Sequence, residues 1–240
     1  KKMILAAVIA AALFLCSCSF GASIDTLLVP PSLGMEQEQI YNALQNAVGK
    51  DIKLQYPKTG DYLSAFILSD LDGDNENEAL VFYTKMGLSA AENGLRINVL
   101  DQDNDTWRSV CDIPAEGAEI ERVIISPIGA YADAQIVIGY SIVDQSDKGL
   151  VVYDYENGGL IKNFTAIYSL FDIHDLDGDG LQELLVLQTD SSTSGAKAAV
   201  YVPDEQKQFR KTQLTLRSSC TGFSQVQYSK RDDGSAAVYA

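Results

Sequence analysis

Apolar and polar positions follow three different patterns along the chain. Residues 3–16 form an unbroken apolar run behind two lysines. Apolar side chains then recur at helical spacing over residues 35–49, and this segment ends at a glycine, which predicts one short amphipathic helix. From about residue 60 the pattern alternates every second residue, is rich in Val, Ile, Tyr and Phe, and is interrupted by Gly, Asp and Asn. The sequence therefore predicts an all-β region preceded by a leader and a helix.

The helix and the segment before it have separate expected roles. Residues 18–34 are small and polar and include two prolines, which is typical of a tether. The apolar side of the helix is expected to dock on the neighbouring β region. The apolar positions of the helix are Met35, Ile40, Ala43, Leu44, Ala47 and Val48.

The leader has the features of a secretory signal peptide over residues 1–17. Its apolar run is short for a hydrocarbon core of about 30 Å and follows positive charge. Its end, Leu15-Cys16-Ser17-Cys18, resembles a bacterial lipobox, although a small residue is usual where Cys16 stands. The resemblance implies a lipid on Cys18, a membrane anchor and an extracytoplasmic location. The alternative is an ordinary secretory signal with two incidental cysteines.

The β region contains an internal repeat. Three predicted hairpins can be superimposed, and their second strands open with Trp107, Leu160 and Phe209, which are 53 and 49 residues apart. A period near fifty residues with four short strands per unit is typical of a β-propeller blade. The sequence thus predicts a β-propeller of four-stranded blades. The expected blades are 61–115, 118–166, 167–217 and a partial fourth at 218–240.

The fourth expected blade has only two strands. An open blade leaves an unpaired strand edge that invites aggregation, so we expect further blades after residue 240. As an alternative, one of the strand-like segments 24–29 and 52–56 completes the last blade from the N-terminal side.

Two acidic segments repeat at an offset of 105 residues, SDLDGDNENEALV from residue 69 and HDLDGDGLQELLV from residue 174. Counted from the first Asp, acids stand at positions 1, 3, 5 and 9, and position 6 holds Asn75 or Gly180, which tolerate a positive φ. Alternating oxygen ligands suit a hard cation, and Ca²⁺ suits them better than Mg²⁺. The expected ligands are Asp70, Asp72, Asp74, the carbonyl of Glu76 and Glu78 in the first loop, and Asp175, Asp177, Asp179, the carbonyl of Leu181 and Glu183 in the second.

These loops differ from EF-hand loops. An EF-hand needs an acid at position twelve and a helix afterwards, whereas Val81 and Val186 stand there and strands follow. The acid at position nine and the flanking strands resemble the FG-GAP/VCBS repeats of integrin-type propellers, although the Phe-Gly and Gly-Ala-Pro landmarks of that family are absent. The alternative is a pair of acidic turns without an ion. The corresponding loop of the second blade is expected to bind no metal, because its ligand positions hold Pro127, Gly129, Tyr131 and Gln135.

Other polar residues are interpreted without a binding role. Asp101, Asp103 and Asp105 also alternate, but they are assigned to a solvated hairpin turn. Cys111 and Cys220 are too few for a disulfide framework and are interpreted as small buried side chains, and the alternative is that they pair with each other.

Composition excludes some classes of function. The 240 residues contain 18 basic and 33 acidic side chains, a net charge of −15, which excludes a nucleic-acid partner. With a single histidine and no paired catalytic carboxylates, we expect no enzyme and no catalytic residue. The family resemblance implies a Ca²⁺-binding surface module for adhesion or for binding a protein or glycan. The alternatives are a cell-surface enzyme acting on polysaccharide and a structural scaffold for a C-terminal domain.

Overall fold

The computed structural model describes residues 33–89, 92, 94–104, 106–131, 133–142, 148–190, 195–216 and 222–240. Its contacts divide the chain into residues 1–36 and 37–240, and apart from the first turn of the helix the account below concerns the second unit. The predicted signal peptide, Cys18 and Cys220 lie outside the described residues. No described helix is long and apolar enough to cross a membrane.

The predicted amphipathic helix is α3 (Met35–Val48). It ends at Gly49, which has a φ of 96° and donates its N–H to the Gln45 carbonyl at 3.0 Å, as expected for a helix C-terminus. Ile40 and Leu44 are completely buried. The face of the helix that packs on the β region includes fewer residues than the apolar pattern predicts, because Met35 is 81% exposed and Ala47 is also exposed.

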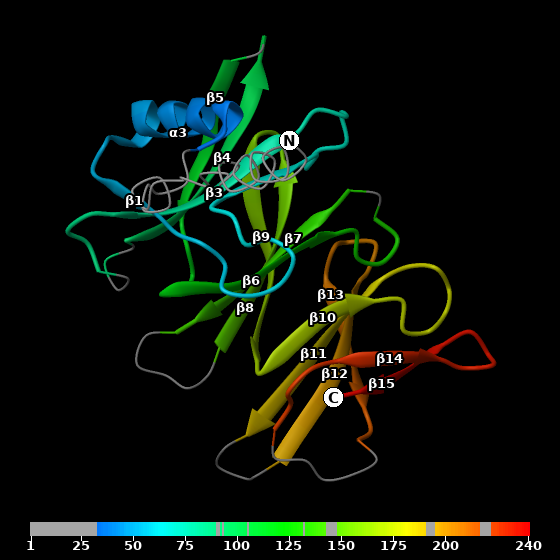
Figure 1. Ribbon diagram of the computed structural model, residues 1–240. Helices are drawn as coiled ribbons and strands as arrows, with labels where there is room; N and C mark the ends of the chain where they lie inside the picture. Colours follow the sequence, from blue (N-terminus) through cyan, green and yellow to red (C-terminus); the bar gives the residue numbers. More distant parts are fainter. Residues whose placement is uncertain are drawn as a thin grey trace, which may run out of the picture. The chain divides into compact units, whose positions relative to one another are not determined.

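Four antiparallel sheets follow the helix (Figure 1). The first contains β1 (Ile52–Leu54), β2 (Phe66–Ser69), β3 (Glu78–Lys85), β4 (Leu95–Asp103) and β5 (Thr106–Pro114). The second contains β6 (Glu119–Ser126), β7 (Gln135–Ser141), β8 (Lys148–Glu156) and β9 (Gly159–Tyr168). The third contains β10 (Leu170–His174), β11 (Glu183–Asp190), β12 (Gly195–Pro203) and β13 (Phe209–Leu214). The fourth is the hairpin β14 (Gln227–Lys230) and β15 (Ala236–Tyr239).

Strand order follows chain order in the second and third sheets, so that each is a simple antiparallel meander. In the first sheet, β1 and β2 share one edge of β3: β1 pairs with residues 83–85 and β2 with residues 78–81. The proposal that residues 52–56 complete the last blade is therefore wrong. This segment extends the first sheet, because β2 is too short to cover the whole edge of β3.

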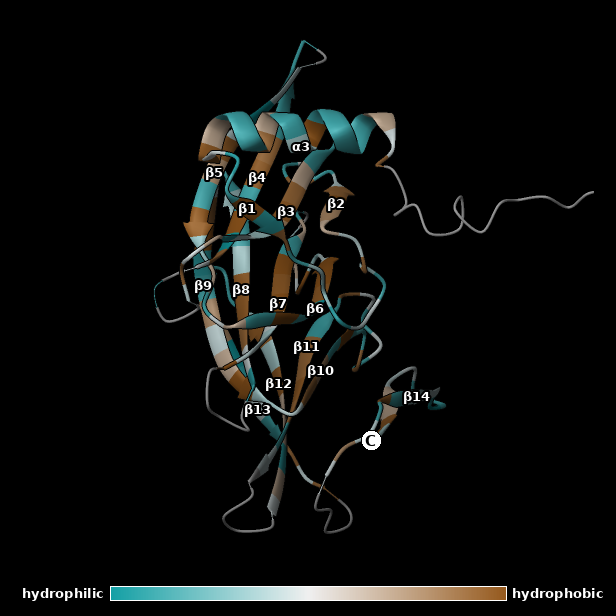
Figure 2. Ribbon diagram, turned by 60° about the vertical axis from the view of Figure 1, so that its left-hand side comes forward, coloured by the Kyte–Doolittle hydropathy of each residue, from teal (hydrophilic) through white to brown (hydrophobic). Residues whose placement is uncertain are grey.

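Both faces of the successive sheets are buried, which explains the near-continuous apolar strands (Figure 2). On β3, Ala79 and Val81 belong to the core shared with α3, while Leu80 and Phe82 belong to the core shared with the second sheet. A third core joins the second and third sheets, and a fourth joins the third sheet to the β14–β15 hairpin. The alternation along each strand thus distributes side chains between two neighbouring layers.

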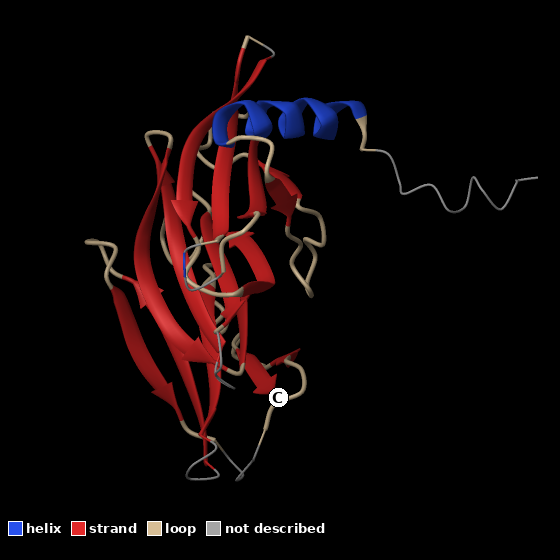
Figure 3. Cartoon of the chain, turned by 90° about the vertical axis from the view of Figure 1, so that its left-hand side faces the viewer, coloured by secondary structure: helices blue, strands red, loops and turns tan. Residues whose placement is uncertain are grey.

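The expected fold class is confirmed at the level of an all-β architecture of antiparallel sheets with one helix (Figure 3). The sheets described here do not close into a ring. Cys111 is a free thiol that is partly buried against the core between the first two sheets, so the expectation of a small buried side chain is confirmed only in part. It lies on the outer strand β5 between Val110, which is 43% exposed, and Asp112, so this part of the strand remains partly open to water.

Candidate metal sites

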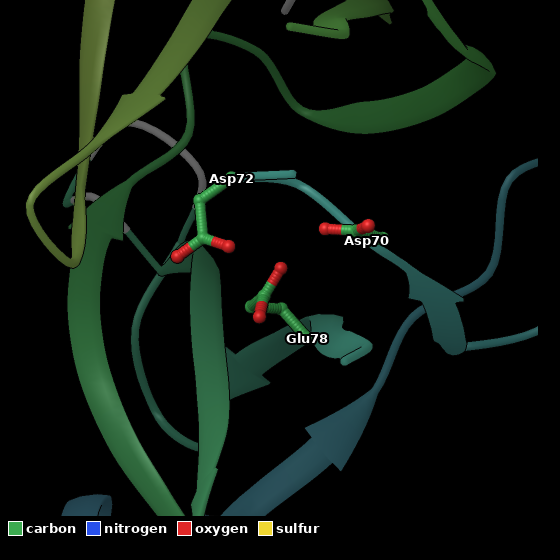
Figure 4. A group of neighbouring side chains, drawn as sticks. All are labelled: Asp70, Asp72 and Glu78. Atoms are coloured by element: carbon green, nitrogen blue, oxygen red, sulfur yellow. The ribbon is translucent and has the colours of Figure 1, made fainter. Parts of the chain in front are cut away.

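The two acidic segments form corresponding loops of the first and third sheets. One connects β2 to β3 and the other connects β10 to β11. In the first loop, one carboxylate oxygen from each of Asp70, Asp72 and Glu78 lies within 4.8 Å of the others (Figure 4). Asp175, Asp177 and Glu183 form the matching group in the second loop. The structure therefore brings together the predicted ligands at positions 1, 3 and 9.

The aspartate at position 1 organises each loop. Asp70 Oδ1 accepts the N–H of Gly73 at 2.7 Å, and its Oδ2 accepts the N–H of Asn75 at 3.0 Å. Asp175 makes the same two hydrogen bonds, at 2.7 and 3.0 Å, to the residues at positions 4 and 6 of its own loop. Such side-chain-to-backbone bonds hold a tight turn in place of regular secondary structure.

The backbone at position 6 has the predicted left-handed conformation in both loops. Asn75 has a φ of 72° and Gly180 a φ of 90°. Position 4 also has a positive φ, 81° at Gly73 and 84° at Gly178. Asparagine therefore replaces glycine at position 6 of the first loop with its backbone conformation retained.

The glutamate at position 9 is the buried member of each group. Glu78 is 1% exposed and Glu183 is 5% exposed. In each case Oε2 accepts a backbone N–H from position 2 of the loop at 2.6 Å, from Leu71 or Leu176. The other oxygen of Glu78, Oε1, is buried without a hydrogen-bond partner. An unpartnered buried carboxylate oxygen beside two more carboxylates is the arrangement that a bound cation satisfies.

Burial and neighbouring charge make these carboxylates difficult to ionise without a cation. Burial, followed by the negative charges of Asp72, Asp101 and Asp74, raises the pKa of Glu78 to about 7, against the lowering effect of the Leu71 hydrogen bond. The pKa of Glu183 is also raised, chiefly by burial. Each loop therefore concentrates negative charge around a partly desolvated carboxyl group.

The aspartates predicted at position 5 are not part of these groups, which contain side-chain ligands only, so the backbone carbonyls of Glu76 and Leu181 stay a prediction. The carboxylate of Asp74 accepts the N–H of Glu76 at 2.7 Å, and that of Asp179 accepts the N–H of Leu181 at 2.8 Å. Both bonds stay within the loop turn, which accounts for the separation of these side chains from the three grouped carboxylates. At position 7 the exposed Leu181 side chain offers no ligand atom, so any oxygen there comes from the backbone.

The corresponding loop of the second sheet keeps the hydrogen bond between positions 2 and 9 but has no carboxylate at positions 1, 3, 5 and 9. It connects β6 to β7, and Gln135 stands at position 9, 4% exposed. Gln135 Oε1 accepts the N–H of Ile128 at 2.7 Å, which is the hydrogen bond that Glu78 makes in the first loop. No group of metal-ligating side chains is found in the described part of this loop. The amide thus keeps the local fold and removes the charge.

Sequence analysis missed one acidic residue near the first loop. Asp101 was assigned to a solvated turn, but it lies within β4 and is half-buried. The β3–β4 register pairs Ala79 with Leu100, so Asp101 stands opposite Glu78. The alternation of side chains along β4 could have indicated the face on which Asp101 lies. That it stands opposite Glu78 follows only from the register between β3 and β4.

No protein-family model matches the chain, and no curated protein matches its sequence.

Proposed function

We propose that the chain is part of a Ca²⁺-binding β-propeller and that each of its two acidic loops holds one Ca²⁺. The supporting features are the period of about fifty residues, the four-stranded meanders and the burial of both faces of successive sheets. Propeller blades have this strand order and this burial pattern. The resemblance of the acidic loops to FG-GAP/VCBS repeats points to the same architecture.

The observation that carries the metal proposal is the environment of Glu78. Its Oε1 atom is buried and unpartnered, and its carboxylate belongs to a group with those of Asp70 and Asp72. The second loop repeats the group and its backbone hydrogen bonds. Only oxygen ligands are offered, and a loop built on several carboxylates with additional backbone oxygens suits the larger, irregular coordination shell of Ca²⁺ better than that of Mg²⁺.

In this function the ions are structural. Each ion ties the end of one strand to the start of the next by neutralising carboxylates that otherwise repel one another. Sites in extracellular modules bind Ca²⁺ with dissociation constants of about 10⁻⁴–10⁻³ M, so they fill outside the cell and stay largely empty in the cytosol.

Thermal unfolding of the purified full chain tests the metal proposal. With two sites of that affinity, 10 mM Ca²⁺ is expected to stabilise the fold by about 3–5 kcal/mol over a chelator, which raises the melting temperature by roughly 6–20 °C. Equal Mg²⁺ is expected to give a clearly smaller shift. Identical melting curves in Ca²⁺ and in chelator would contradict the proposal.

The proposal includes a lipid anchor on Cys18 and a role as a surface module that binds a protein or a glycan. Both follow from the lipobox-like leader and from the family resemblance, and the anchor predicts that Cys18→Ala abolishes palmitate labelling and releases the chain from membranes. Labelling that persists in this variant would contradict the anchor. Cleavage of a cell-surface polysaccharide by the purified chain would contradict a purely binding role.

A further inference from the structure

The two acidic loops have the same ligand positions but different neighbours on the adjoining strand. In the first sheet, the β3–β4 register places Asp101 opposite Glu78. In the third sheet, the β11–β12 register pairs Leu184 with Tyr201 and so places Val202 opposite Glu183. Directly opposed residues of antiparallel strands share a face, with Cβ atoms about 5 Å apart. The first site therefore has an additional carboxylate that the second site lacks.

The second sheet also has an acid opposite position 9 of its loop, and there the acid is paired with a positive charge. Asp154 stands opposite Gln135, because Ile136 pairs with Tyr153. Asp154 is 6% exposed, and the ammonium group of Lys207, from the β12–β13 turn of the next sheet, lies 3.1 Å from its Oδ2. A side chain of the following sheet thus supplies the positive charge.

Asp101 receives no such charge from the described residues. Arg108 stands opposite it on β5, but Arg108 Nη1 lies 2.7 Å from Asp103 Oδ2 instead. The following sheet contributes the phenol of Tyr155 to this region: the pKa of Tyr155 is raised by its burial and then by the charges of Glu78, Asp101 and other acids. A tyrosine is neutral at physiological pH, so the charges of Glu78 and Asp101 remain uncompensated.

Like charges directly opposed on neighbouring strands destabilise a sheet. Beside Glu78, whose buried Oε1 atom is already unpartnered, a second carboxylate increases the benefit of a cation in the loop. We propose that Asp101 determines the affinity of the first site, so that this loop binds a divalent cation more tightly than the loop in which Val202 holds the corresponding position. The inference rests on the proposed function, because it assumes that both loops bind Ca²⁺.

Single-site variants of the full chain separate the two loops. Glu183→Gln leaves only the first site and Glu78→Gln leaves only the second, since glutamine at position 9 is already accommodated in the second sheet. Titration calorimetry with CaCl₂ is expected to give an affinity about tenfold higher for the first site, which is the effect expected of one additional charge several ångströms from a divalent ion in a largely hydrated site.

The residue itself is tested in these backgrounds. In the Glu183→Gln chain, Asp101→Asn is expected to weaken Ca²⁺ binding about tenfold. Asp51→Asn makes the same change of charge at an exposed residue near the opposite end of β3 and is expected to change binding less than twofold. In the Glu78→Gln chain, Val202→Asp is expected to strengthen binding. A gain of affinity cannot arise from unfolding. The Val202→Asp variant therefore tests the role of this position even if Asp101→Asn weakens binding only because it unfolds the chain.

The outcomes distinguish the two proposals. If neither single-site chain binds Ca²⁺, the proposed function fails. If both bind equally, or if Asp101→Asn weakens binding no more than Asp51→Asn, Ca²⁺ binding stands and the role of Asp101 is overturned.

Discussion

The first acidic loop and the β6–β7 loop show two ways of stabilising the same turn. In both, the side chain at position 9 accepts the N–H at position 2, at 2.6 Å for Glu78 and 2.7 Å for Gln135. The acidic loop is otherwise held by its own aspartates. The β6–β7 loop is held by the next sheet: the N–H of Gly129 donates to the Gln182 carbonyl at 2.7 Å, and the hydroxyl of Tyr131 accepts the N–H of Lys207 at 3.0 Å.

The difference shows that the hydrogen-bond frame and the charge are separate properties of this loop. The frame needs only an acceptor at position 9, which an amide supplies as well as a carboxylate. The charge strengthens the hydrogen bond from Leu71, but burial and repulsion outweigh this gain and raise the energy of the metal-free loop. The cation proposed above would account for the charge of the two acidic loops, whereas the neutral loop is held by Lys207 and by packing on the next sheet.

The largest expected effect comes from exchanging the residues at position 9. The carboxyl of Glu78 has a pKa of about 7 in the folded chain against an ordinary value of 4.5, so the metal-free fold holds a proton that the unfolded chain releases between these values. Its stabilising contribution is present below pH 4.5 and is lost as the pH rises through 7. In chelator, Glu78→Gln is therefore expected to be more stable than the wild type at pH 7.5, by up to about 3 kcal/mol, and equally stable near pH 4.5.

Urea unfolding of both proteins between pH 4.5 and 7.5 measures this difference. In excess Ca²⁺ at pH 7.5 the advantage of Glu78→Gln is expected to shrink by about 1.5–2.5 kcal/mol, because the ion in the first loop stabilises only the chain that keeps the Glu78 carboxylate. The reciprocal variant, Gln135→Glu, places a carboxylate opposite the buried Asp154 in a loop without aspartate ligands, so Ca²⁺ should not rescue its loss of stability. Equal pH dependence of wild type and Glu78→Gln in chelator would show that Glu78 ionises normally.

A smaller change of stability is expected when alanine replaces the glycine at position 4, and its size should differ between the two acidic loops. Gly73 and Gly178 have nearly the same φ, 81° and 84°, so alanine introduces a similar backbone strain of roughly 1 kcal/mol at either position. A Cβ at Gly73 would meet only Asp133 Oδ1 at 3.8 Å, whereas a Cβ at Gly178 would lie 2.6 Å from the backbone of Gly234. Gly178→Ala is therefore expected to destabilise the fold by about 1–2 kcal/mol more than Gly73→Ala in chelator. Equal losses in urea unfolding would contradict the close packing of the β14–β15 turn on this loop.

Much of this arrangement could be predicted from local sequence, because it depends on local physics. Alternating apolar residues gave the strands, and Asn75 was identified as the residue that replaces glycine at a positive φ. The position of Asp101 opposite Glu78 could not be predicted in the same way, because it depends on the register between two strands. The shared edge of β3 likewise depends on the length of β2, which the period-2 pattern does not define.

A last effect, no larger than the previous one, tests the ion pair between Lys207 and the buried Asp154 of the second sheet. Lys207 forms ion pairs with Asp154 and Glu156 and lies over the Tyr131 ring, and its hydrogen bonds to Glu156 and Asp154 raise its pKa. Lys207→Met leaves Asp154 buried with Asn163 as its remaining side-chain partner. Because the lysine side chain is 38% exposed and screened by water, we expect a loss of about 1–2 kcal/mol rather than the larger effect of a fully buried pair.

This loss should be the same in Ca²⁺ and in chelator, because positions 1, 3, 5 and 9 of the β6–β7 loop hold Pro127, Gly129, Tyr131 and Gln135 and offer no carboxylate. Lys230→Met, at an exposed lysine on β14, serves as the control for removing one positive charge from an acidic chain. Unfolding free energies that fall equally in the two variants would show that the ion pair with Asp154 contributes nothing specific. If Ca²⁺ restored the stability that Lys207→Met loses, the neutral loop would be able to bind a cation once the lysine is removed. The lysine side chain alone would then determine whether this loop binds a cation.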